Sequence, residues 1–165
     1  MKLGLMIIDM QKAYYQGPTV EQMDAAAEYI NWVIPKFEAK GLPIVWVYNV
    51  DDEDKVVPGD PSFEFIDSLK PGSEHLKINK TYGNSFNKTD ADRILKDAGV
   101  DTVVMTGFCA EFCVLSTYRG AKDLDYFPVI LKNGIASHKP ENKEFVEEIS
   151  ETVTAGVLEK MIQSQ

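Results

Sequence analysis

Short runs of hydrophobic residues alternate along the chain with segments whose hydrophobic residues recur at helical spacing. Continuous apolar runs with β-branched residues predict strands that are buried on both faces. We expect such strands at residues 3–8, 44–50, 102–106 and 127–131, with a shorter strand at 76–79. The segment 51–72 contains several prolines and glycines, which predicts a long loop with one short helix after Asp60.

Helices are predicted between these strands. Thr19 followed by Gln22 is typical of a capping box, and the helix that it opens ends at Gly41. We expect Pro35 to kink this helix or to end its regular part. Further helices are predicted after Thr89 as far as Gly99, and over residues 112–124, 141–149 and 153–162.

This alternation predicts an α/β fold: a three-layer, doubly wound, mostly parallel sheet of five or six strands with helices on both faces. No convincing sixth strand follows Ser137. No linker or repeat interrupts residues 1–165, so we expect a single domain. Ligands of such sheets bind beyond the carboxyl ends of the strands. Asp9, Asn49, Lys80 and the segments 107–113 and 133–138 follow these ends.

Composition narrows the classes of partner. The 165 residues are 44% hydrophobic and 26% charged, with a net charge of −9. Nucleic acids and anionic membranes both reward basic surfaces, so we expect neither as a partner and expect a small-molecule substrate instead. The apolar run at 3–8 is too short for a signal peptide or a membrane span, and we expect a cytoplasmic protein.

Two charged residues stand at predicted strand ends. Asp9 follows an apolar run, and a buried carboxylate is costly unless it is paired. It is either a functional group or a helix cap or structural ion pair. Lys80 lies between a short strand and a polar turn, and it is either functional or ordinary solvated surface.

Cys113 follows a strand and a glycine-containing turn, near the start of a helix. A helix N-terminus stabilises negative charge, so we expect a lowered thiol pKa and a reactive group, with an inert buried cysteine as the alternative. Cys113 and Arg119 match the spacing of protein phosphatases, but the residues between them contain no glycine and read as helix. Cys109 and Cys113 do not make a zinc site, and no nucleotide-binding glycine motif occurs.

Four segments together resemble the isochorismatase-like family of cysteine hydrolases, which includes nicotinamidases and N-carbamoylsarcosine amidases. The segments are Leu5-Met6-Ile7-Ile8-Asp9-Met10-Gln11 with Tyr14, Leu42-Pro43-Ile44-Val45, Lys80-Thr81-Tyr82-Gly83-Asn84-Ser85-Phe86 with Thr89, and Val103 to Val114 with Thr117 and Ala121. They occur in order and span most of the chain, and three of them contain, at a predicted strand end, a residue type that the family uses for catalysis.

The resemblance implies a catalytic triad of Asp9, Lys80 and Cys113. Cys113 is then the nucleophile that forms an acyl-enzyme, Asp9 moves the proton, and Lys80 holds both charges in place. The resemblance also implies an oxyanion hole made of the backbone N–H groups of Cys109 and Cys113, and a cis peptide bond between Phe108 and Cys109. Cys109 stands where the family has a small residue, and we interpret it as a packing residue.

Gln11, Tyr14, Tyr82, Phe86 and Tyr118 lie near these motifs and are candidate substrate-pocket residues, with ordinary core packing as the alternative for each. Nicotinamidases hold a metal with an aspartate and histidines after the second strand, whereas residues 51–72 here contain no histidine. We therefore expect no metal and no cofactor.

The resemblance thus implies a hydrolase that cleaves an amide, carbamoyl or ureido C–N bond of a small molecule, and a homodimer or homotetramer. The alternatives are an isochorismatase-type hydrolase of another small substrate, or a non-catalytic oligomeric binding module of the same fold. The substrate itself is open.

Overall fold

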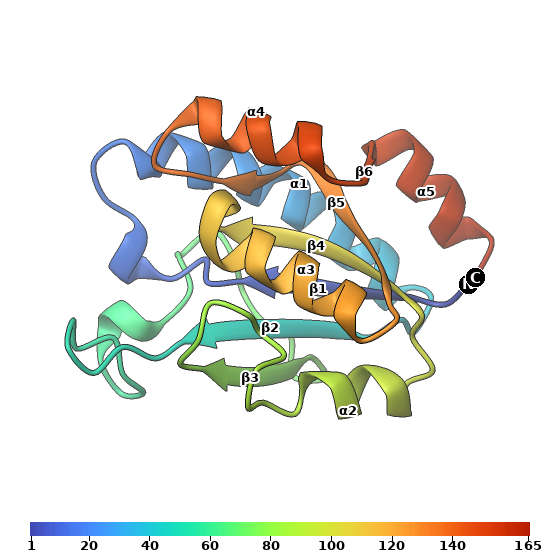
Figure 1. Cartoon of the computed structure of the whole chain (residues 1–165), viewed down its shortest axis with the longest axis horizontal. Helices are drawn as coiled ribbons and strands as arrows, with labels where there is room; N and C mark the ends of the chain where they lie inside the picture. Colours follow the sequence, from blue (N-terminus) through green and yellow to red (C-terminus); the bar gives the residue numbers. More distant parts are fainter.

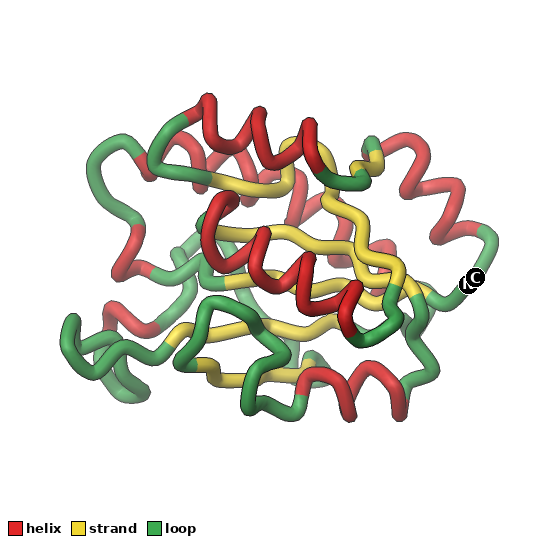
Figure 2. The backbone as a smooth tube through the Cα atoms, in the orientation of Figure 1, coloured by secondary structure: helices red, strands yellow, loops and turns green.

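The computed structural model describes all residues from Met1 to Gln165, and its centre is one six-stranded sheet. Every strand pairs with its neighbours in parallel, in the order β3-β2-β1-β4-β5-β6 (Figures 1 and 2). The strands are β1 (Leu3–Ile8), β2 (Ile44–Asn49), β3 (Leu76–Lys80), β4 (Thr102–Phe108), β5 (Phe127–Ala136) and β6 (Thr152–Val153). The α/β class is confirmed, and the sheet is wholly rather than mostly parallel.

Helices cover both faces of the sheet. They are α1 (Thr19–Glu38), α2 (Ala91–Asp97), α3 (Leu115–Asp123), α4 (Pro140–Ile149) and α5 (Ala155–Gln163), with short turns η1 (Lys12–Tyr14), η2 (Pro61–Phe63) and η3 (Ala110–Val114). One buried cluster packs α1 and α5 against the sheet, and a second packs α2, α3 and α4 against the other face. None of these helices is long and apolar enough to cross a lipid bilayer.

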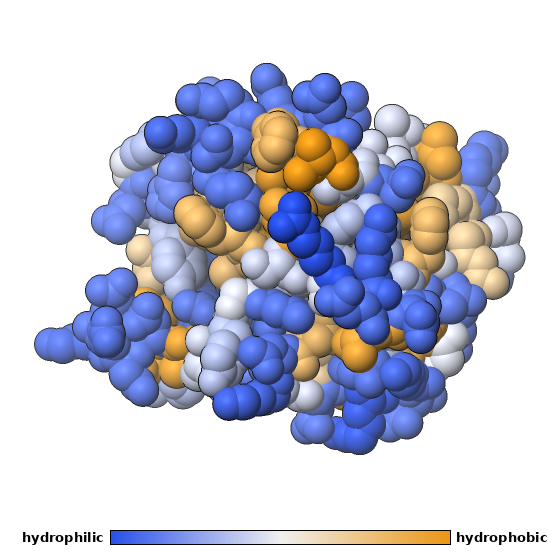
Figure 3. Space-filling view, in the orientation of Figure 1, coloured by the Kyte–Doolittle hydropathy of each residue, from blue (hydrophilic) through white to orange (hydrophobic).

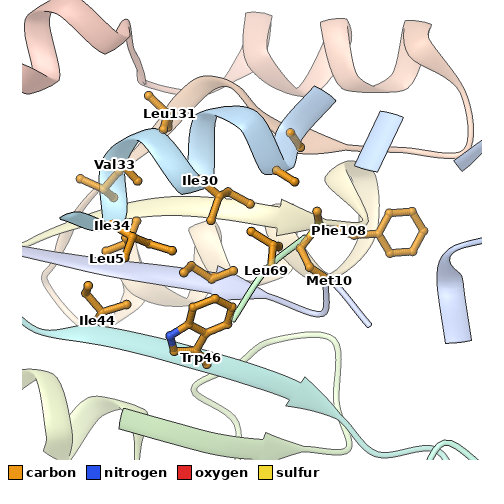
Figure 4. Close-up of a cluster of buried hydrophobic side chains, with 14 of the residues drawn as sticks. Leu5, Met10, Ile30, Val33, Ile34, Ile44, Trp46, Leu69, Phe108 and Leu131 are labelled. Atoms are coloured by element: carbon orange, nitrogen blue, oxygen red, sulfur yellow. The ribbon is translucent and has the colours of Figure 1, made fainter. Parts of the chain in front are cut away.

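Strand β1 shows why its sequence reads as a continuous apolar run. Leu3, Leu5 and Ile7 belong to the cluster under α1, while Met6 and Ile8 belong to the cluster on the opposite face. Successive side chains of a strand point to opposite faces, so a strand covered on both sides needs no polar positions. Figure 4 shows the first cluster, with α1 side chains such as Ile30 lying over the sheet.

Helix α1 differs from its prediction at both ends. No capping box forms: Pro18 occupies the N-cap position, and the Thr19 hydroxyl donates to the backbone of the preceding loop, 2.8 Å from the Gln16 carbonyl oxygen. Pro35 does not end the helix, which continues to Glu38. The buried side chains of Ile34 and Phe37 pack the last turn onto the core, and this packing outweighs the hydrogen bond that proline cannot make.

The C-terminal part of the sheet also differs from the prediction. Strand β5 extends five residues beyond Leu131, because a bulge shifts its register with β4 and Asn133 adopts a positive φ of 66°. A sixth strand exists as the two residues of β6, where the sequence favoured the start of a helix. Two residues carry too little periodicity to be recognised as a strand.

Candidate active site

Three side chains from three strand ends meet beyond the carboxyl edge of the sheet. Asp9 directly follows β1 and adopts a left-handed φ of 49°, and its N–H donates to the Val47 carbonyl oxygen at 3.0 Å. This turn points the chain back toward the sheet, and the Asp9 residue is only 1% exposed. The structure therefore places a carboxylate in the interior, where it requires a partner.

The partner of Asp9 is Lys80, the last residue of β3, which is 2% exposed. Lys80 Nζ lies 2.7 Å from Asp9 Oδ2 and 3.3 Å from Cys113 Sγ. It also donates to Asn49 Oδ1 at 3.1 Å. Lys80 thus joins all three residues, through an ion pair with Asp9 and hydrogen bonds to Asn49 and Cys113.

Cys113 is presented by an unusual turn after β4. Gly107, with a φ of 117°, makes the approach possible, because a Cβ atom there would lie 2.1 Å from the Ile8 carbonyl oxygen. The Phe108–Cys109 peptide bond is cis. Cys113 lies in the π-helical turn η3, and the regular helix α3 begins only at Leu115, three residues later than predicted. Turns of this kind recur at functional sites.

The protonation of Cys113 contradicts the expectation of a lowered pKa. Burial, and then the negative charge of Asp9, raise the pKa of the Cys113 thiol to about 12, although the Lys80 ammonium acts in the opposite direction. Burial also raises the pKa of Asp9, against the attraction of Lys80. The raised pKa of Cys113 favours the neutral thiol, which lies beside the Asp9 carboxyl group.

Asn49, at the end of β2, joins the site although the sequence marked it only as a strand end. Its Oδ1 accepts from Lys80, and its Nδ2 donates to the Tyr14 hydroxyl at 2.7 Å. The side-chain amide of Gln11 holds the Asn49 backbone from both sides, accepting from its N–H at 2.7 Å and donating to its carbonyl oxygen at 3.1 Å. Its position after a buried strand was the available signal.

Gln11 and Tyr14 are the candidate pocket residues that lie beside this cluster. Gln11 is fully buried and also donates to the Phe63 carbonyl oxygen at 2.9 Å, so its amide is occupied by protein contacts. Tyr14 is half-buried and stacks on Phe108, with ring centroids 5.4 Å apart. Burial, together with the charges of Asp9 and Cys113, raises the pKa of Tyr14 to about 12.

The other three candidate pocket residues have contacts elsewhere. Phe86 stacks on Tyr126 in the core under α2 and α3, and the buried Tyr118 accepts a hydrogen bond from the Glu151 N–H at 2.9 Å. Tyr82 is exposed and accepts from Lys88 at 2.9 Å. Phe86 and Tyr118 thus make the core contacts that were the alternative to a pocket role, because both belong to the buried cluster under α2, α3 and α4.

Neither a phosphate cradle nor a metal cluster accompanies Cys113. Arg119 is exposed on α3, while Cys113 Sγ contacts Lys80. No group of three or more histidine, cysteine, aspartate or glutamate side chains is arranged to hold a metal ion. The ring nitrogens of His75 contact Trp46 and Glu38, outside the cluster, and the ring of His138 packs edge-on against Phe108.

Comparisons with known proteins agree with this geometry. The family model for the isochorismatase domain matches residues 4–159. The isochorismatase family protein YrdC of Bacillus subtilis strain 168 is 27% identical over 139 residues, which cover 82% of this chain and 74% of that protein. The ureidoacrylate amidohydrolase RutB of Klebsiella pneumoniae is 25% identical over 174 residues, covering 82% and 73%. The crystal structure of N-carbamoylsarcosine amidase from Thermoplasma acidophilum is 26% identical with a TM-score of 0.81, covering 93% of this chain and 95% of that one.

Proposed function

Because this chain belongs to the isochorismatase family of hydrolases, we propose that it cleaves a C–N bond of a small amide, carbamoyl or ureido compound through an acyl-enzyme on Cys113. The observation that carries the proposal is the position of Lys80 Nζ, 2.7 Å from Asp9 Oδ2 and 3.3 Å from Cys113 Sγ. A base and a nucleophile held by one cation form the arrangement that nucleophilic catalysis needs.

The reaction begins from the neutral thiol. Cys113 Sγ attacks the carbonyl carbon while its proton passes to Asp9, whose raised pKa makes it a better proton acceptor than an exposed carboxylate. The C–N bond then breaks, the leaving nitrogen takes the proton from Asp9, and the acyl group remains on sulfur as a thioester. Water then attacks the thioester and gives a proton to Asp9. The C–S bond breaks, the acid is released, and Asp9 returns the proton to Cys113 Sγ.

Asp9 has the free acceptor that these proton transfers require. Asp9 Oδ2 is ion-paired with Lys80 at 2.7 Å, and both carboxylate oxygens are buried without a well-formed hydrogen bond. A buried acceptor without a partner costs stability, roughly 1–3 kcal/mol, and such groups persist at functional sites. We assign Oδ1 to the thiol proton of Cys113 and then to the N–H of the leaving group.

The developing negative charge on the substrate oxygen requires donors of its own. The Lys80 ammonium is already ion-paired with Asp9 and hydrogen-bonded to Asn49 and Cys113, so we do not assign it to that oxygen. We assign this role to the backbone N–H groups of Cys109 and Cys113, at the turn between β4 and η3. Preorganised backbone donors of this type contribute strongly to acyl transfer.

Tyr14 supplies a donor for the rest of the substrate. Lys80 can only donate, so it fixes Oδ1 of Asn49 as the acceptor and turns Nδ2 toward Tyr14. The Tyr14 oxygen therefore accepts, and its own hydrogen is left for an acceptor on the substrate. The names of RutB and of N-carbamoylsarcosine amidase support ureido and carbamoyl compounds, which carry a second carbonyl or carboxylate acceptor.

Intact-mass spectrometry tests the proposal. The protein is mixed with ureidoacrylate, N-carbamoylsarcosine and a simple aliphatic amide, and each mixture is examined for product and for an acyl adduct on Cys113. We expect turnover of at least one compound, lost in Cys113→Ala and in Lys80→Met. Lys77→Met is the matched control, because Lys77 lies on the same strand with an exposed side chain. Full turnover by folded Cys113→Ala, or no turnover across the panel, contradicts the proposal.

A further inference from the structure

The carboxylate of Glu111 binds the nucleophile turn to two other elements, and the proposed mechanism does not use it. Glu111 Oε2 accepts from the Cys109 thiol at 3.1 Å and from the Ser137 hydroxyl at 2.7 Å. Glu111 Oε1 accepts from Asn142 Nδ2 at 2.7 Å. The carboxylate thus joins the start of η3 to the end of β5 and to the first turn of α4.

Both oxygens of the Glu111 carboxylate already accept hydrogen bonds from the protein, so we do not assign it a step of the reaction. Burial alone would raise the pKa of Glu111, but its own N–H, Asn142, Ser137 and Cys109 together hold the pKa below its usual value. The charges that act on the Cys113 thiol are those of Asp9 and Lys80, and Glu111 is not among them. We therefore look for the role of Glu111 in the residues that its carboxylate contacts.

What Glu111 contacts instead is the residue that carries an assigned oxyanion donor. Cys109 is buried, and its Sγ lies 3.1 Å from Glu111 Oε2 and 4.0 Å from the Ser137 hydroxyl, two groups that also contact each other. Burial, and then Glu111, raise the pKa of the Cys109 thiol to about 12, so the thiol keeps the proton that it donates. A side chain fixed in this way also fixes its own backbone.

We propose that Glu111 is a positioning residue that holds Cys109, through its thiol, so that the Cys109 N–H remains directed at the oxyanion. The proposal rests on the proposed function, because it assumes that Cys113 attacks a carbonyl. It also gives a reason for a cysteine at position 109: a small side chain fits the buried turn, and an S–H reaches the carboxylate. An alanine there would leave the Glu111 oxygen with one donor fewer.

A small aldehyde tests the position of the oxyanion donors without knowledge of the substrate. Cys113 adds its S–H across the C=O of ¹³C-labelled acetaldehyde, so the S–C bond forms and the thiol proton reaches the former carbonyl oxygen. The thiohemiacetal oxygen occupies the oxyanion position, and its ¹³C signal measures the dissociation constant. Iodoacetamide alkylates the same sulfur at a saturated carbon, with no oxyanion, and measures the nucleophile alone.

We expect Glu111→Ala to weaken the thiohemiacetal roughly tenfold to a hundredfold, the scale on which a displaced or lost oxyanion donor acts. The rate of Cys113 alkylation should be unchanged. Glu111→Gln keeps the shape and one acceptor oxygen, and it should lie between the wild type and Glu111→Ala. Cys109→Ser retains a donor and should be milder than Cys109→Ala. Glu148→Gln, on the exposed side of α4, is the matched control.

The dissociation constant of the adduct and the alkylation rate together show whether the positioning role or the proposed function has failed. An unchanged dissociation constant in Glu111→Ala overturns the positioning role. So does a parallel fall in adduct stability and in alkylation rate, since that result indicates general damage to the turn. If the wild type forms no adduct at Cys113, the proposed function fails and the inference fails with it. Circular dichroism melting confirms that each variant is folded, and Glu111→Gln serves if Glu111→Ala is not.

Discussion

The side-chain amide of Gln11 forms two hydrogen bonds with the backbone of Asn49. It accepts from the Asn49 N–H at 2.7 Å and donates to the Asn49 carbonyl oxygen at 3.1 Å. Asn49 in turn holds Lys80 at 3.1 Å. The position of the Lys80 ammonium therefore depends on the fully buried Gln11 amide, which makes no contact with it.

Replacing Gln11 by alanine should reduce both stability and turnover. The change leaves the Asn49 N–H without its acceptor, at a cost of roughly 1–3 kcal/mol. It also loosens Asn49, so kcat should fall by more than KM changes. Urea unfolding and steady-state kinetics measure the two effects, and Gln16→Ala, in an exposed loop position, is the control. Unchanged stability would mean that water replaces the amide fully.

Replacing Asp9 by asparagine should separate thiol reactivity from turnover. Asp9 raises the pKa of Cys113 and Lys80 lowers it, so removing the carboxylate leaves only the lowering charge. Alkylation of Cys113 by iodoacetamide at neutral pH should become faster than in the wild type, while hydrolysis is lost with the base. The pH dependence of the alkylation rate measures the shift. A slower alkylation in Asp9→Asn would contradict the electrostatic account of the site.

Replacing Lys80 by methionine should abolish activity and make the stability of the protein depend on whether Asp9 is protonated. A buried carboxylate that loses its cation costs roughly 3–5 kcal/mol unless it takes up a proton. Folded Lys80→Met should therefore gain stability as the pH falls toward mild acid, and the double variant with Asp9→Asn should recover most of the loss. Thermal melting across pH measures this recovery, and an additive double variant would show that the two residues are not coupled.

The ionised carboxylate of Glu111 should stabilise the folded protein at neutral pH and lose this effect in acid. Its pKa is lowered in the folded state from a usual value of 4.5, so the stabilisation is complete above about pH 4.5 and is lost as the pH falls through the lower, folded value. Glu111→Gln should be less stable than the wild type near neutrality and should approach it in acid. Urea unfolding at several pH values tests the sign, and a constant difference would refute it.

Tyr14→Phe should raise KM for substrates that carry a second acceptor while leaving simple amides almost unaffected. The change removes only the hydroxyl and keeps the ring that stacks on Phe108. Loss of a neutral hydrogen bond costs roughly 0.5–1.5 kcal/mol, equivalent to a few-fold to about tenfold in affinity. Equal effects on both classes of compound would indicate that the hydroxyl serves Asn49 alone.

The layered architecture could be predicted because burial on both faces leaves a plain signal. Apolar runs such as Leu3–Ile8 are sufficient to identify central parallel strands, and strand order does not need to be known to place Asp9, Lys80 and Cys113 at one edge. The two-residue strand β6 and the extension of β5 escaped prediction, since both arise from pairing across the sheet and not from local pattern.

The protonation and the supporting contacts of the site were less predictable than which residues lie at the strand ends. The pKa of Cys113 was expected to fall, because a helix N-terminus is visible in sequence, whereas the nearby charge of Asp9 depends on the folded arrangement. Asn49 and Glu111 are ordinary polar residues in sequence. Their roles follow from contacts with residues 31 and 26 positions away, Lys80 and Ser137.

The exposed loop between β2 and β3 divides the site as well as the chain. Asp9 and Asn49 precede this loop, while Lys80 and Cys113 follow it, and the sheet joins the two groups by placing β2 and β1 between β3 and β4. Figure 3 shows hydrophobic as well as hydrophilic side chains on the outer face over α3 and α4, while the buried clusters that hold the two halves together lie against the two faces of the sheet. Two fragments cut at residues 52–54 would each hold an inert half of the cluster. Recovered hydrolysis on mixing them would report reassembly of the sheet, which makes the enzyme a candidate split reporter.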